Sequence, residues 1–385
     1  MEHQKITLSH PRYQFLPGLT GLYLHIWLRD VGRGLIAIFI PLYVYKLTGS
    51  LALPFIMHAL YQLMVVLGVF WQPKLIQKIG LDRSAALGAV FRTGSLIFFI
   101  LAGKSVWFLP LAFIFWGMAI HFTWIPHHYT VLQADDGDEK YGKESSKAMV
   151  AQKLAEIASP FAGGLIVSML GFNWLYVLAL FFVTISALPL FLDRIEKKDM
   201  HWNLTEFKKD LFSFRQRRLN LGFIGEGLEG TIPFWPLFIY LYLGKVEKVG
   251  MITSVSMLVA VLALYLLGKY TDKRGKGWAK KFFFGLTAVW LLRPFFRTVL
   301  GFTLIDSFYY IFYSFMMLGV YSYIYEFAHR EHKFQFLVRR EFLIHLAGSA
   351  GCLLMALAIS MDFWLLGFLL AAGGVWLMKN AVYRE

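Results

Sequence analysis

Short pieces of this sequence recur 195 residues apart, as at positions 39 and 234, within segments apolar enough to lie in a membrane. Residues 39–45 (FIPLYVY) and Gly49 match residues 234–240 (FWPLFIY) and Gly244. At the same offset a second pattern recurs, with Lys74, Lys78 and Gly80 set against Lys269, Lys273 and Gly275. Apolar segments align easily by chance, but the shared Pro, Gly and Lys positions favour a true duplication. Two similar apolar halves predict a pseudo-symmetric membrane protein.

The composition excludes an ordinary soluble protein. Of the 385 residues, 58% are hydrophobic and 16% charged, whereas soluble domains carry about 25% charged residues. A helix needs about 20 mostly apolar residues to span a bilayer. We find such segments at 19–47, 52–73, 84–103, 106–127, 148–170, 173–192, 220–243, 249–268, 281–300, 303–325, 340–360 and 362–379. We therefore predict an all-α membrane protein with twelve transmembrane helices in two pseudo-symmetric six-helix bundles.

Basic residues gather on one side of the predicted membrane, in the linker after the sixth segment and in the loop after the eighth. The positive-inside rule places both, and both termini, on the cytoplasmic side of a cell (inner) membrane. The predicted units are a bundle at 1–192, a basic linker at 193–219 and a bundle at 220–385. Residues 202–212 are either an amphipathic helix on the membrane surface or a solvated part of the linker. The net charge of +14 is explained by the basic cytoplasmic loops and by their attraction to anionic membrane lipid, which is a predicted partner. Nucleic-acid binding is not needed to explain it.

A loop motif follows the eighth segment. Residues 268–277 read GKYTDKRGKG, which places Gly268, Asp272, Lys273 and Gly275 in one short turn. Together with twelve segments in two halves, this motif resembles the loop signature of the major facilitator superfamily. The resemblance covers about residues 15–380 and implies two bundles that rock about a central site by alternating access. It does not imply a particular substrate.

The equivalent loop in the first half departs from the motif. Lys78 and Gly80 remain and are followed by Asp82 and Arg83, but Gln77 stands where the Asp belongs. We predict that both loops form a gate, in which an acidic side chain pairs with a basic one across the halves and releases it on opening. The alternative is that these are short basic loops that obey the topology, with their charges solvated.

Two carboxylates lie deep in the seventh segment. Counting from Arg218 at about 1.5 Å per residue, Glu226 lies ~12 Å and Glu229 ~16 Å into the membrane. Their spacing of three puts both on one helix face. Two carboxylates this close favour one bound proton, which suits proton coupling. The alternative is a structural role, with each carboxylate paired to an arginine on a neighbouring helix.

The repeat transfers this depth to the first segment, where position 34 is equivalent to 229 and Asp30 lies ~10 Å inside. Arg33 lies slightly deeper and can pair with Asp30 at spacing three, while His25 and Arg29 complete a stripe on the same helix. In the alternative, the segment begins near residue 31, and Arg29 and Asp30 are rim residues that reach out to water.

Four further ionisable residues complete the predicted site. Arg92 and Arg293, in corresponding helices of the two halves, suit an anionic substrate group. They equally suit structural pairs with Glu226, Glu229 or Asp30. Glu156 lies three residues after Lys153, and the two can neutralise each other. His345 follows Glu341 by four and can relay protons, with Glu341 expected at the membrane rim.

Enzymatic and metal-binding signatures are lacking. The pair His329 and His332 is spaced by three rather than the four of a zinc helix, and residues 135–139 fall short of a calcium loop. There is no phosphate-binding loop and no nucleophile elbow. We therefore predict a secondary transporter of a small molecule, without cofactor, metal or catalysis, coupled to protons and directed to export because of its aromatic-rich segments. The alternatives are a lipid-handling protein or a membrane-embedded enzyme or sensor.

Overall fold

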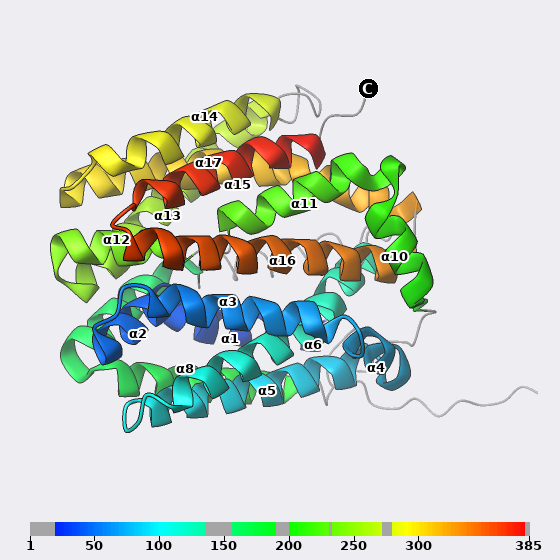
Figure 1. The fold of residues 1–385 in the computed structure, drawn as a ribbon, viewed down its shortest axis with the longest axis horizontal. Coiled ribbons are helices and arrows are strands. Elements are labelled where there is room, and N and C mark those ends of the chain that lie inside the picture. Colours follow the sequence, from blue (N-terminus) through cyan, green and yellow to red (C-terminus); the bar gives the residue numbers. More distant parts are fainter. Residues whose placement is uncertain are drawn as a thin grey trace, which may run out of the picture.

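The computed structural model describes residues 20–134, 156–189, 200–230, 233–271, 279–330 and 332–381, and throughout these ranges the regular structure is helical. Figure 1 shows two groups of helices, one formed before the linker and one after it, lying against each other along their lengths. Within the described ranges, helices occupy all twelve predicted segments.

The first half contains α1 Thr20–Ile36, α2 Ile40–Thr48, α3 Leu53–Gly68, α4 Gln72–Ile79, α5 Leu81–Ala102, α6 Phe108–Ala134, the helix Glu156–Leu170 and α8 Phe172–Ser186. The linker contributes α10 Leu204–Phe212 and a short 3-10 turn, Phe214–Gln216. The second half contains α11 Arg217–Gly230, α12 Phe234–Leu243, α13 Val246–Thr271, α14 Ala279–Leu292, α15 Val299–Arg330, α16 Lys333–Ser360 and α17 Leu365–Met378.

Among the described residues, six helices are long and apolar enough to cross a membrane, and the pair α3 and α4, bent by 59° at the break between them, brings the count to seven if it forms one span. Three apolar helices are shorter: Glu156–Leu170, α8 and α17. The bend after α3 has a local cause, because Pro73 lies in the first turn of α4 and cannot donate a backbone hydrogen bond. The prediction of one straight helix over 52–73 is therefore wrong in this detail.

Two predicted boundaries are also wrong. The ninth segment was expected to reach residue 300, but α14 ends at Leu292 and a 3-10 turn containing Pro294 follows. The eleventh segment was expected to begin at residue 340, but α16 begins at Lys333. Its first turns carry Arg339 and Arg340, whose charges suggested a loop although both side chains are buried.

The 195-residue repeat appears as matching backbone geometry. The span formed by α1 and α2 ends at Gly49 with φ of 68°, and the span formed by α11 and α12 ends at Gly244 with φ of 67°. Each glycine N–H donates to a tyrosine carbonyl, to Tyr45 at 2.8 Å and to Tyr240 at 2.7 Å. The rings of these two equivalent tyrosines lie 6.3 Å apart. A pseudo-two-fold axis therefore passes between them.

The two halves meet along α3 and α16, which lie side by side in Figure 1. They also meet where the helix Glu156–Leu170 packs on α13. There a Cβ on Gly250 would collide with the carbonyl of Pro160, and one on Gly164 would press on Glu247. Glycine is thus required for this close backbone approach, as is common between membrane helices.

Candidate transport site

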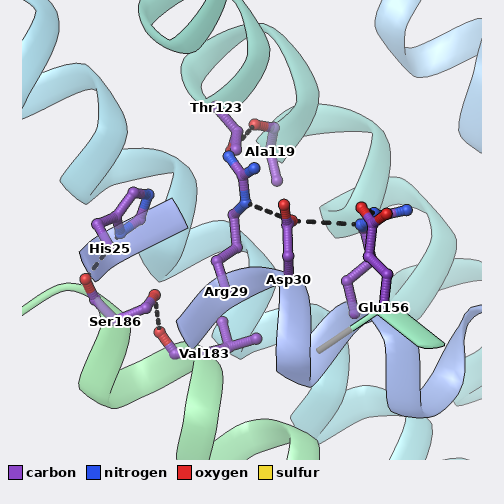
Figure 2. A network of polar contacts seen from close by, with 9 residues as sticks. His25, Arg29, Asp30, Ala119, Thr123, Glu156, Val183 and Ser186 are labelled. Carbon is purple, nitrogen blue, oxygen red and sulfur yellow. Dashed lines mark hydrogen bonds and ion pairs between the residues drawn. The ribbon is translucent and has the colours of Figure 1, made fainter. Parts of the chain in front are cut away.

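A charge network in the first half joins α1 to the helix Glu156–Leu170. Asp30 accepts hydrogen bonds from Nε of Arg29 at 3.0 Å and from Nε of Arg33 at 3.3 Å. Arg33 also donates through Nη2 to Glu156 at 3.2 Å. Figure 2 shows Arg29 and Glu156 on either side of Asp30. The predicted pairing of Asp30 with Arg33 is confirmed.

Arg29 and Asp30 are 6% and 0% exposed, so the interpretation that they lie at a solvated rim is wrong. The reason is packing, because the guanidinium of Arg29 lies 5.1 Å from the Trp124 ring centroid on α6. His25, one turn earlier, bonds through Nδ1 to the carbonyl of Ser186 on α8 at 2.7 Å. Both terminal nitrogens of Arg29 are buried without a hydrogen-bond partner among the described residues.

Arg92 lies on α5 and differs from the other arginines of this half. Within the described part of the chain no carboxylate lies at ion-pair distance from it. Its guanidinium instead lies 4.9 Å from the Trp116 ring centroid, and Tyr61 stacks on the same tryptophan at 4.8 Å. The structural pairs proposed for Arg92 from the sequence are therefore not formed in this conformation.

In the second half the main cluster surrounds Arg293. Its Nη2 donates to Asp306 on α15 at 2.6 Å, and Trp235 on α12 donates to the same carboxylate oxygen at 2.7 Å. Three ring centroids lie within 4.2 Å of the guanidinium carbon, those of Trp235, Trp290 and Tyr309. The partners predicted for Arg293 from the sequence, Glu226, Glu229 or Asp30, are therefore wrong, because the carboxylate that pairs with it is Asp306. A lone acid in the apolar stretch 303–325 was the signal that could have identified it.

The two carboxylates of α11 have different partners. Glu229 accepts from the hydroxyl of Tyr309 at 2.8 Å and from Nε1 of Trp290 at 3.2 Å, and its Oε2 is buried without a hydrogen-bond partner in the described ranges. Glu226 is paired with Arg340 on α16. The alternative of an arginine partner therefore holds for Glu226, whereas Glu229 is held by neutral donors.

A polar chain crosses from α16 to α3. Arg340 donates through Nη1 to Glu341 at 2.8 Å, and Glu341 lies 3.5 Å from Nε2 of His345. The other ring nitrogen of His345 bonds to Gln62 in the first half. Glu341 was predicted at the rim, which is wrong because two turns of α16 precede it and its side chain is buried.

The predicted gating loops are described only in part. Lys78 and Arg83 are exposed, and Gly80 adopts φ of 89° where α4 turns into α5, whose first turn contains Asp82. Gln77 donates to the carbonyl of Met200 in the linker at 2.6 Å. In the second half Gly268 lies in α13, while Asp272, Lys273 and Gly275 lie outside the described residues, as does Lys153.

A family model described as Major Facilitator Superfamily matches residues 22–329. The chain belongs to the major facilitator superfamily. This major facilitator chain is an integral membrane protein and a transporter rather than an enzyme. The crystal structure of nucleoside transporter NupG is similar in fold, with a TM-score of 0.68 and 14% identity over 94% of this chain and 99% of that one. No curated protein matches this superfamily member significantly.

Proposed function

We propose that this secondary transporter binds a small molecule between its halves, at a site formed by Arg33, Arg92, Glu156 and Tyr61 from the first half and His345 from the second. The rings of Tyr61 and His345 lie 5.6 Å apart across the boundary between the halves. Tyr310 of α15 adds a hydroxyl within electrostatic reach of Glu156. The five side chains of the proposed site come from five different helices of the two halves: α1, α3, α5, the helix Glu156–Leu170 and α16. A central binding site between two bundles draws its residues from several helices in this way.

The exposure of Arg33 carries this proposal. Its side chain is 35% exposed although it bonds to Asp30, which is completely buried. A charged side chain at this depth is very unfavourable against lipid, so its open part faces a wet space inside the protein. Arg92, without a carboxylate partner among the described residues, lies on the same half within electrostatic reach of Arg33.

The chemistry of the site supports a substrate class. Arg92 offers hydrogen-bond donors to an acceptor or anionic group, and the rings of Tyr61 and Trp116 offer a surface for stacking a planar ring. We propose a small polar solute with a planar ring. Nucleosides are the first compounds to test, because NupG has the same fold.

Proton coupling is proposed through Glu229 and His345. Glu229 is held by two neutral donors and its Oε2 has no partner in the part of the chain that the structure describes, so it can accept a proton without breaking an ion pair seen there. His345 lies between Gln62 of the first half, to which Nδ1 is hydrogen-bonded, and Glu341, which is 3.5 Å from Nε2, so it joins the two halves in one polar chain along which a proton can pass. We also propose export as the direction of transport. The proposed units are two bundles at 1–192 and 220–385, joined by the linker 193–219. The linker and both termini are proposed to lie on the cytoplasmic side of the membrane.

Transport into proteoliposomes tests the site. Arg92→Gln is expected to reduce substrate uptake at least tenfold, because a charge-assisted hydrogen bond is worth about 1.5–3 kcal/mol. Arg297→Gln is the matched control, since Arg297 is exposed at the turn before α15. Wild-type uptake by Arg92→Gln for every transported compound would overturn the site.

An imposed pH gradient tests the coupling. Glu229→Gln is expected to abolish gradient-driven accumulation while leaving exchange of substrate at equal pH intact. Glu206→Gln, in the exposed linker helix, is the control. If Glu226→Gln and Glu229→Gln both leave gradient-driven flux unchanged, coupling through these residues is wrong.

A further inference from the structure

A groove separate from the central site lies where the linker meets the second half. It has a volume of about 620 Å³ and runs between the end of α10, the start of α11 and the middle of α16. Its lining is mainly apolar, with Leu221 and Ile224 on α11 and Phe342, Leu343 and Leu346 on α16. None of these residues belongs to the proposed transport site.

The linker side of the groove carries two large exposed rings. Phe212 and Phe214 line the groove and are 83% and 85% exposed. The linker is fixed behind them, because Asp210 accepts from Gln335 at 3.1 Å and lies 3.7 Å from Arg339. Phe207 of α10 is buried against Phe342. Because α10 is fixed to the second half, the two rings are held pointing away from it. An amphipathic helix on the membrane surface, the first of the two interpretations of residues 202–212, agrees with such an exposed apolar surface.

The polar end of the groove consists of Arg217 and Asn220. Arg217 is exposed, and two more exposed arginines, Arg215 and Arg218, are its near neighbours in the sequence, so the chain is strongly basic at this end of the groove. Asn220 is 6% exposed and donates through Nδ2 to the carbonyl of Leu211 at 3.0 Å. Its Oδ1 is buried and has no hydrogen-bond partner among the described residues. A buried amide oxygen of this kind requires a donor, which a ligand can supply.

The position of the groove selects its occupant. It begins at the first turn of α11 and continues onto α16, where Leu346 is exposed on a membrane-spanning helix. The apolar part is thus continuous with the lipid-facing surface, and the basic part lies at the end of the span. Membrane phospholipid is the class of molecule that has acyl chains beside an anionic headgroup.

We propose that this groove binds one anionic phospholipid of the phosphatidylglycerol type. Its acyl chains lie against Leu221, Leu343 and Leu346, its phosphate is held by Arg217, and a headgroup hydroxyl donates to Oδ1 of Asn220. The lipid then joins the linker to α11 and α16, the two helices that carry Glu226 and Arg340. This inference goes beyond the proposed function and does not depend on it.

The test uses the full chain in detergent, titrated with phosphatidylglycerol, phosphatidylcholine or inorganic phosphate. Native mass spectrometry is expected to show one tightly retained phosphatidylglycerol, with a matching rise in the thermal midpoint and a much smaller effect of phosphatidylcholine. Equal retention of both lipids would overturn the headgroup assignment. An equal stabilisation by inorganic phosphate would assign the rim to a free anion instead.

Two variants locate the lipid. Leu346→Trp fills the groove, and Leu353→Trp places the same bulk on an exposed position of α16 outside the groove. Arg217→Gln is expected to weaken phosphatidylglycerol retention about tenfold, while Arg297→Gln leaves it unchanged. Lipid-free thermal midpoints identify variants that fail to fold. Wild-type retention by both Leu346→Trp and Arg217→Gln would overturn the proposal whatever the transport assays show.

Discussion

Asp30 in the first half is shared by two arginines, whereas Asp306 in the second half is bonded to Arg293 and a tryptophan. The first cluster continues to Glu156 on another helix and is partly open at Arg33. The second is closed, since Arg293 and Asp306 are both almost fully buried beneath aromatic rings.

The difference extends to the balance of charge. In the first half the clusters described above contain three arginines, Arg29, Arg33 and Arg92, and two carboxylates, Asp30 and Glu156. In the second half they contain three arginines, Arg293, Arg339 and Arg340, and four carboxylates, Glu226, Glu229, Asp306 and Glu341, with Asp210 of the linker beside Arg339. Duplication therefore preserved the backbone, seen at Gly49 and Gly244, while the charges diverged. The difference agrees with the proposed function, in which the first half contributes most of the substrate site and Glu229 and His345 of the second half take part in proton coupling.

The largest expected effect is at the closed cluster. Asp306→Asn leaves Arg293 buried without its counter-charge, which costs about 3–5 kcal/mol. We expect a large drop in the thermal midpoint of purified protein. The double variant Arg293→Met with Asp306→Leu removes both charges and is expected to recover most of the loss. A midpoint for Asp306→Asn equal to wild type would contradict the closed-cluster description.

Glu156→Gln is expected to have a smaller effect, about 1–3 kcal/mol, because Arg33 keeps Asp30 and is partly solvated. Adding Glu156→Gln to Asp30→Asn should then cost more than the sum of the single changes, since Arg33 loses both partners. Denaturant unfolding in micelles gives these values. Strict additivity would show that the two carboxylates do not share Arg33.

The smallest effect concerns the axis where the halves match. Tyr45→Leu and Tyr240→Leu, alone and together, form a double-mutant cycle for one aromatic contact, with an expected coupling of about 0.5–1.5 kcal/mol. Tyr265, exposed on α13, provides the control when cycled with Tyr240. Zero coupling between Tyr45 and Tyr240 would show that this ring contact does not stabilise the meeting of the two halves.

Hydropathy predicted the spans well, because a membrane helix needs a long apolar run whatever its neighbours are. It failed where tertiary partners neutralise charge. The charges of Arg339 and Arg340 placed the start of the eleventh segment at residue 340, at the membrane rim, but α16 already contains both: Arg339 lies 3.7 Å from Asp210 and Arg340 is paired with Glu226. Hydropathy also could not show the ion pair between Arg293 and Asp306. Only the packing of α14 against α15 brings Asp306, rather than Glu229, to Arg293.

The glycine contact between the helix Glu156–Leu170 and α13 has a mechanical consequence. Backbone lies against backbone at Pro160 and Gly250, so the two helices cannot approach more closely at this point. Gly250 lies four residues from the start of α13, about 6 Å along a helix of 26 residues. If the halves rock as alternating access requires, this contact would be an off-centre pivot. The end of α13 at Thr271 would then move several times further than the end at Val246.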